Sequence, residues 1–214
     1  MAARPRRRTP AKAATAAASS NPQDWLFLNP GGVSESGIVF GCLRKTYKGR
    51  TNSAVEFGWH KAHPLAPPHG VDTSRWAPTA ERVEVVLPTG ADDGLLDPVV
   101  LLARMDACAV AREKALLVYL TLPLGHAGKV HEAWECARSF VRNRFARERG
   151  LATMLALHSP GRVGSPNPLH AHALIVPRRL SLGIEHGAYD EELIRDAGQA
   201  IVEADWTEHL AAFL

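Results

Sequence analysis

Two strand-like segments near the C-terminus, joined by a short connection, place the strongest limit on how this chain can fold. Residues 151–159 (LATMLALHS) and residues 170–179 (HAHALIVPRR) are rich in apolar and β-branched residues. Between them lies only the polar stretch PGRVGSPNPL. Parallel neighbours in a sheet need a longer crossover, which is usually a helix. The two segments are therefore predicted to be antiparallel neighbours in one sheet.

Other strand-like and helix-like segments surround this pair. The apolar patterns predict strands at 36–47, at the start of 81–94 and at 116–123, and helices over 51–62, 97–115, 128–150 and 190–214. Asp97 and Pro98 suit the N-cap and first position of one helix, and Gly150 suits the end of another. The sequence predicts an α+β domain: a mostly antiparallel central sheet with helices packed on it.

Length and composition limit the organisation of the chain. With 214 residues, of which 46% are hydrophobic, the chain can form one domain with a real core. Residues 1–22 are rich in arginine and alanine and are predicted to form a disordered basic tail, solvated or in contact with nucleic-acid phosphates, ahead of a folded domain over 23–214. Three cysteines without metal-binding spacing indicate a reducing, cytoplasmic location. No apolar run is long enough to predict a membrane span.

Three histidines fall on the two C-terminal strands. His170 and His172 alternate with Ala171, so they project from the same face of their strand. His158 ends the preceding strand, and antiparallel pairing would bring it beside them. Three imidazoles leave coordination positions open, as a catalytic metal requires. Such a site could take Mn²⁺, Mg²⁺ assisted by substrate oxygens, Zn²⁺ or another divalent ion; alternatively, the histidines are polar groups satisfied within the core.

The block LALHSPGRVGSPNPLHAHALIVPRR resembles the metal-binding block of the MobA/MobL relaxases, which are HUH-type endonucleases. The positions that carry the resemblance are His158, Asn167, Pro168, His170, His172 and Arg178. Weaker similarity extends over about residues 36–214. The resemblance implies a relaxase domain that uses a divalent metal, Mn²⁺ or Mg²⁺, at the three histidines. It also implies nicking and strand transfer of single-stranded DNA at a transfer origin during plasmid mobilisation, together with accessory mobilisation proteins.

The sequence departs from the family at two positions. The family's nucleophile is a tyrosine seven residues after a serine, and that spacing leads here from Ser53 to His60. His60 is therefore one candidate nucleophile, and Tyr47, in the preceding basic loop, is another. Strand 116–123 also lacks the family's glutamate that supports the metal site. Glu113, Glu84 or a backbone carbonyl would have to replace it.

Two basic stretches are candidates for contact with DNA. The loop RKTYKGR holds four cationic residues around a tyrosine that could stack on a base. A second pair follows the histidine strand. The predicted phosphate contacts are Arg44, Lys45, Lys48, Arg50, Arg178 and Arg179. A solvated basic turn is the alternative for the first stretch.

Two other functions remain open at this point. The missing tyrosine is compatible with a catalytically impaired, DNA-binding protein built on the relaxase fold. The stretch HAHALIVPR also resembles histidine-triad nucleotide hydrolases, although their third histidine position is occupied here by Leu174.

Overall fold

The central element of the protein is an antiparallel sheet. The computed structural model describes residues 19–72, 77–110, 115–180 and 183–213. Within these residues six strands form one sheet in the order β1-β2-β6-β8-β7-β5, and β3 and β4 form a separate hairpin. The bounds are β1 Leu26–Leu28, β2 Val39–Leu43, β3 Thr46–Tyr47, β4 Arg50–Thr51, β5 Arg82–Val86, β6 Leu117–Pro123, β7 Leu151–His158 and β8 His170–Arg179. The predicted α+β class and the antiparallel pairing of β7 with β8 are confirmed.

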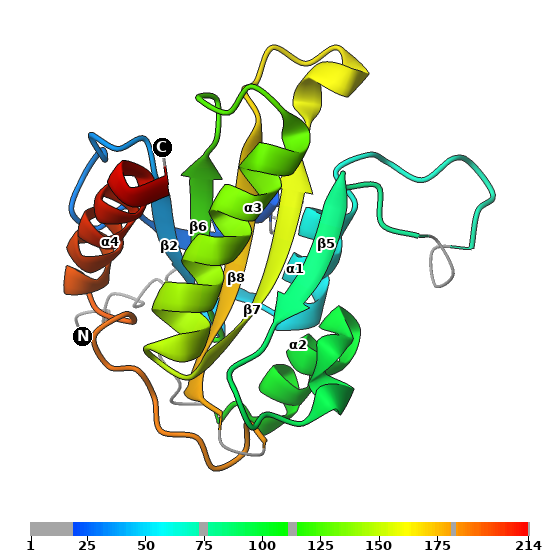
Figure 1. Cartoon of the computed structure of the whole chain (residues 1–214). Coiled ribbons are helices and arrows are strands. Elements are labelled where there is room, and N and C mark those ends of the chain that lie inside the picture. Colours follow the sequence, from blue (N-terminus) through cyan, green and yellow to red (C-terminus); the bar gives the residue numbers. More distant parts are fainter. Residues whose placement is uncertain (1–18, 73–76, 111–114, 181–182, 214) are drawn as a thin grey trace, which may run out of the picture.

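Helices cover both faces of this sheet (Figure 1). The first face carries α1 (Ala54–Ala62) and α2 (Pro98–Cys108). The second carries α3 (Val130–Phe140), its π-helical continuation η4 (Val141–Arg147) and α4 (Ala197–Phe213). Short 3-10 turns are η1 (Pro22–Trp25), η3 (Asp93–Leu96) and η5 (Pro160–Val163). No helix in the described ranges is both long and apolar enough to cross a membrane.

Alternation along β8 divides its side chains between the two faces. Ala171, Ala173 and Ile175 belong to the core under α3 and α4. Leu174 and Val176 belong to the core under α1 and α2. Because successive strand residues point to opposite faces, the two histidines of β8 lie on the α1 side.

Several predicted element bounds are wrong. The expected helix over 190–214 begins only at Ala197, because Asp190 is buried and paired with Arg149 at 3.0 Å in a preceding turn. The helix expected over 97–115 ends at Cys108, and its residues 111–114 lie outside the described ones. The strand expected over 36–47 is divided into β2 and one arm of the β3–β4 hairpin.

The residues just before the expected domain start, 19–22, form hydrogen bonds with the segment that follows. The indole nitrogen of Trp25 donates to the carbonyl of Ser19 at 2.8 Å, and the side chain of Asn21 caps η1. Strand β1, which the sequence did not predict, then pairs with β2 at the edge of the sheet. Residues 1–18 of the predicted basic tail lie outside the described part of the chain.

Candidate metal centre

Strand register brings the three histidines together. His158 pairs directly with His170 across β7 and β8, and His172 lies opposite Ala156 on one side and Thr121 on the other. The imidazole centroids are 4.4 Å apart for His158 and His172, 4.8 Å for His170 and His172, and 5.3 Å for His158 and His170. One ring nitrogen from each residue lies within 4.8 Å of the others. The geometry therefore offers three convergent nitrogen donors.

Backbone carbonyls orient two of the imidazoles. His158 Nε2 lies 2.6 Å from the carbonyl oxygen of Lys61, in the last turn of α1. His170 Nδ1 lies 2.8 Å from the carbonyl oxygen of Pro168, just before β8. In the tautomer that donates to each carbonyl, the other ring nitrogen carries a free lone pair. Such hydrogen bonds orient the histidine ligands of metal sites.

Hydroxyl groups orient the third imidazole. His172 Nδ1 lies 2.8 Å from Tyr119 Oη and 3.2 Å from Thr121 Oγ1, both on β6. The two hydroxyls are also 2.7 Å apart, and Gln23 Nε2 donates to Tyr119 Oη at 3.4 Å. Burial raises the pKa of Tyr119 to about 12, so its hydroxyl stays protonated. A ring nitrogen of each histidine is therefore contacted by a carbonyl or hydroxyl oxygen rather than by a carboxylate.

The glutamate substitutes expected from the sequence do not have this role in the described structure. Glu84 on β5 accepts a hydrogen bond from Arg138 of α3 at 2.7 Å, on the far face of the sheet. Glu113 lies outside the described residues. The third expected substitute, a backbone carbonyl, contacts His158 and His170. Tyr119 is buried in the apolar core and also supports His172.

Burial keeps two of the imidazoles neutral, those of His158 and His172. It lowers the pKa of His158 to about 4, and a smaller lowering comes from the charges of His170 and Lys61. The pKa of His172 is held well below its ordinary value, mainly by burial and then by the Lys61 ammonium. Because a metal binds the neutral imidazole, protons do not compete for these two nitrogens near pH 7.

Sequence reasoning missed Lys61. Its side chain is buried, and Nζ lies 4.9 Å from the Tyr119 ring centroid and 5.3 Å from that of Phe57. Burial lowers the pKa of this amine to about 8. A signal was present: Ala54, Phe57 and Lys61 are spaced i, i+3, i+7, which places the lysine on the apolar face of α1.

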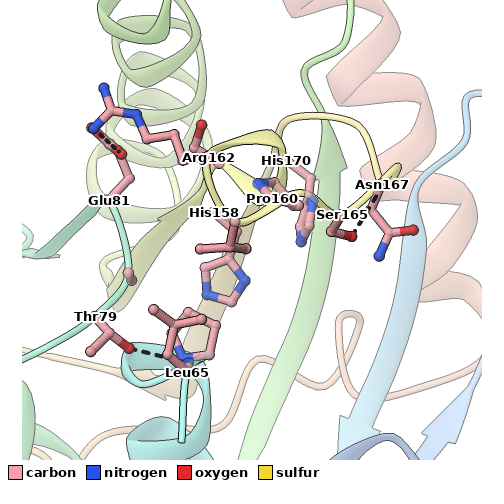
Figure 2. Close-up of a pocket in the computed structure, with 13 residues that line it drawn as sticks. Leu65, Thr79, Glu81, His158, Pro160, Arg162, Ser165, Asn167 and His170 are labelled. Atoms are coloured by element: carbon pink, nitrogen blue, oxygen red, sulfur yellow. Dashed lines mark hydrogen bonds and ion pairs between the residues drawn. The ribbon is translucent and has the colours of Figure 1, made fainter.

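A cavity of about 610 Å³ opens directly beside two of the histidines. His158 and His170 line it together with residues from the segments before β5 and after β7 (Figure 2). An ion pair of 3.0 Å between Arg162 and Glu81 connects the two segments. Asn167, which the sequence resemblance singled out, is also at the edge of this cavity. His158 and His170 are therefore accessible from a space large enough for a nucleotide.

The two nucleophile candidates lie outside the histidine cluster. His60 is on α1 next to Lys61, but its ring packs edge-on against Trp25, with centroids 5.3 Å apart. Burial lowers its pKa, which favours the neutral, nucleophilic form. Tyr47 is on the β3–β4 hairpin, where its ring packs against Phe27. No contact within the described residues joins either side chain to the three histidines.

The predicted phosphate contacts lie at the other end of the histidine strand, or in and just before the β3–β4 hairpin. Arg178 and Arg179 are six and seven residues past His172, which is about 20 Å along an extended strand. The Arg178 guanidinium lies over the Tyr189 ring, 4.7 Å from its centroid.

The four cationic side chains in and just before the β3–β4 hairpin all contact other residues of the protein. Lys45 donates to the carbonyl of Ala109 at 2.6 Å, and Lys48 lies over the Tyr47 ring. Arg44 covers Phe27, whereas Arg50 covers Trp25 and pairs with Glu56. The structure therefore does not gather these six residues around the histidines, and their contact with DNA stays a prediction.

Comparison with known proteins gives a fold-level similarity. No family model matches the chain, and no curated protein matches its sequence. One solved structure, described as the molecular basis of vancomycin resistance transfer in Staphylococcus aureus, has a similar fold with a TM-score of 0.52. The similarity covers 76% of this chain and 86% of the other, at 18% sequence identity. At that identity the similarity establishes the fold alone.

Proposed function

We propose that this protein is a metal-dependent relaxase that nicks single-stranded DNA and transfers the cut strand during plasmid mobilisation. The observation that carries the proposal is the histidine centre: three convergent imidazoles, each contacted by an oxygen atom, of which His158 and His170 line an open cavity. The fold similarity to a structure of resistance transfer supports the same conclusion. We place the activity in the cytoplasm, with single-stranded DNA at a transfer origin and accessory mobilisation proteins as partners.

The donor set fits a divalent transition metal. His158, His170 and His172 would hold it through three neutral nitrogens, which suits Mn²⁺ better than Mg²⁺ because Mg²⁺ prefers oxygen ligands. When bound, such an ion polarises a non-bridging oxygen of the scissile phosphate. The protein itself fixes the three rings through the acceptors on β6, α1 and the loop before β8.

The cavity beside the histidines suits a nucleotide that flanks the scissile phosphate. Its walls present side chains that can hydrogen-bond to a base or a sugar, including Thr79, Arg162, Ser165 and Asn167. Because this cavity and the histidines share His158 and His170, a nucleotide seated there would bring its phosphate to the candidate metal centre.

His60 is the nucleophile candidate that we favour over Tyr47. The last turn of α1 borders the site, because the carbonyl of Lys61 contacts His158. A rotation of the adjacent His60 side chain away from Trp25 would be a local change, whereas Tyr47 is on the separate β3–β4 hairpin. Attack by an imidazole nitrogen on phosphorus would form a phosphoramidate with DNA and release a 3′-hydroxyl.

A second candidate function is a DNA-binding protein of the same fold without nicking activity. The absence of a contact, within the described residues, between either nucleophile candidate and the cluster favours it. The histidine-triad alternative has less support. Leu174, at the third triad position, belongs to the apolar core, and His158 comes from a different strand. A histidine-triad strand would present its three imidazoles in sequence.

Calorimetry with Mn²⁺ tests the metal centre. We expect the intact protein to bind one ion, and His158→Ala and His170→Ala to abolish binding. His131→Ala removes an exposed imidazole at the start of α3 on the other face and serves as the matched control, with unchanged binding expected. Absence of Mn²⁺ binding in the folded intact protein would contradict the proposal.

Nucleophilic activity needs a separate assay. With a library of single-stranded oligonucleotides, an active relaxase forms a covalent adduct that survives SDS. We expect the adduct to persist in Tyr47→Phe and to be lost in His60→Ala. Metal binding without any adduct, together with salt-sensitive binding of single strands, would instead favour the non-nicking DNA-binding protein.

A further inference from the structure

The side-chain ammonium of Lys61 lies beside the candidate metal centre and has no carboxylate partner among the described residues. The residue is only 7% exposed, and within the described ranges its Nζ forms no ion pair. Its neighbours are the faces of two aromatic rings, Phe57 and Tyr119. Aromatic faces attract a cation, but they do not neutralise its charge. Burying an unpaired ammonium is costly, so such a group is expected to have an anionic partner that binds from outside.

The position of Lys61 is tied to the histidines from two directions. Its backbone carbonyl contacts His158 Nε2 at 2.6 Å. Its ammonium lies 4.9 Å from the centroid of the Tyr119 ring, which in turn stacks on His172 with centroids 5.4 Å apart. The helix therefore holds this cation near His158, which lines the cavity, and near the buried His172.

The charge of the centre also indicates the class of ligand. The imidazoles bring no negative charge to the centre, and no carboxylate of the described residues contacts them or the Lys61 ammonium. A divalent ion at the histidines would add two positive charges to that of the lysine. Such a site attracts an anion strongly, and a phosphodiester supplies both the charge and several acceptor oxygens.

We propose that the Lys61 ammonium binds a non-bridging phosphate oxygen of a phosphodiester seated over the three histidines. This inference rests on the proposed function for the identity of its ligand, but it concerns a residue that the sequence resemblance does not assign. Lys61 then contacts the reacting group directly. Its positive charge offsets the negative charge on the phosphate oxygens as the nucleophile adds.

Binding of inorganic phosphate tests this assignment without the need for a DNA sequence. The probe is the broadening of the phosphorus resonance of inorganic phosphate by Mn²⁺ bound to the protein, with Mn²⁺ affinity measured separately by calorimetry. We expect Lys61→Met, which keeps the apolar stem and removes the charge, to weaken phosphate binding by about 10-fold to 100-fold, as loss of a charged hydrogen bond does. Its Mn²⁺ affinity should be unchanged or higher, because a repelling cation has been removed.

Two further variants complete the test. Lys129→Met removes an exposed lysine, paired with Glu132 beside α3, and should leave phosphate binding unchanged. Lys61→Arg keeps the charge and should retain most of the binding. If Lys61→Met prevents folding, Lys61→Gln takes its place, since its amide remains polar.

The outcomes separate this inference from the proposed function. If Lys61→Met binds phosphate as well as the intact protein does, the proposed role of Lys61 is wrong. That result would not contradict the metal centre. Failure of the intact protein to bind Mn²⁺ would overturn the proposed function instead. In that case, the shift of the phosphorus resonance measures phosphate binding to the metal-free protein. This measurement still decides whether Lys61 forms an anion site.

Discussion

The two faces of the central sheet share the same strands but contain very different side chains. The face under α3 and α4 is filled by apolar groups, with Trp134, Phe140 and Trp206 almost completely buried. The face under α1 carries His172 and Lys61 among its apolar side chains, and both are also buried. One strand, β8, contributes to both, because its alternate residues point in opposite directions.

This contrast shows how the fold can accommodate a polar centre. Buried polar groups are costly unless they are hydrogen-bonded, and each histidine has at least one such bond. On the α3–α4 face, aromatic side chains bury a large area. We infer that the α3–α4 face supplies most of the stability, whereas the α1 face carries the chemistry.

The largest expected effect is on the apolar face. Trp206→Ala should lower the free energy of unfolding by about 3–5 kcal/mol, because it empties a fully buried aromatic site next to Phe140. Urea denaturation measures this loss. Mn²⁺ affinity of the folded fraction should stay the same. A loss of metal affinity in proportion to stability would show that the two faces are not independent.

The next effect is on the metal centre. Tyr119→Phe removes the 2.8 Å contact to His172 Nδ1 and should weaken Mn²⁺ binding about 10-fold, because acceptors that orient ligand histidines contribute about 10-fold to 100-fold in affinity. Thr121 remains at 3.2 Å and should limit the loss. Adding Thr121→Val should therefore lower the affinity further in calorimetry. Equal affinity of the double variant and the intact protein would contradict the assigned role.

A smaller effect concerns the stability of the metal-free protein at acid pH. The folded-state pKa of His158 is about 4, below its ordinary value of 6.5, so the unfolded chain binds a proton more readily. Stability is therefore full above about pH 6.5 and falls as the pH approaches 4. For His158 we expect a loss of about 1 kcal/mol between pH 7.5 and pH 5.5. Urea denaturation with a chelator present should show a shallower pH dependence in His158→Gln than in the intact protein.

The smallest expected effect is at the far end of β8. Arg179 is exposed, so Arg179→Ala should change the free energy of unfolding by less than about 0.5 kcal/mol. If this residue contacts a DNA phosphate, the logarithmic salt dependence of single-strand binding should fall by about one unit. An unchanged slope would remove this end of the strand from the DNA-binding surface.

The β7–β8 hairpin could be predicted well from the sequence. The strand predicted over 170–179 matches β8, and the strand predicted over 151–159 differs from β7 by one residue. Here the apolar and β-branched pattern is strong and local, and a short connection permits only one pairing. With the two strands paired antiparallel, the convergence of His158 with His170 follows from strand geometry.

Contacts between distant segments could not be predicted in the same way. Nothing near Tyr119 or Thr121 in sequence indicates a contact with His172, because that contact depends on β6 pairing with β8. The bounds of α4 were wrong because the burial of Asp190 with Arg149 is a tertiary effect that overrides the helical pattern. The hydroxyl and carbonyl acceptors that replace the expected glutamate also depend on tertiary contacts.

The pairing of His158 with His170 within one hairpin also bears on the order of folding. The three imidazoles lie close together along the chain, so closing the loop between their strands has a small entropic cost. The contacts that orient them have a longer reach: Gln23 to Tyr119 spans 96 residues and Lys61 to His158 spans 97. Contacts of that separation form slowly. A complete unfolded chain would thus bring its nitrogen donors together early, while their final alignment depends on the later docking of α1 and the N-terminal segment.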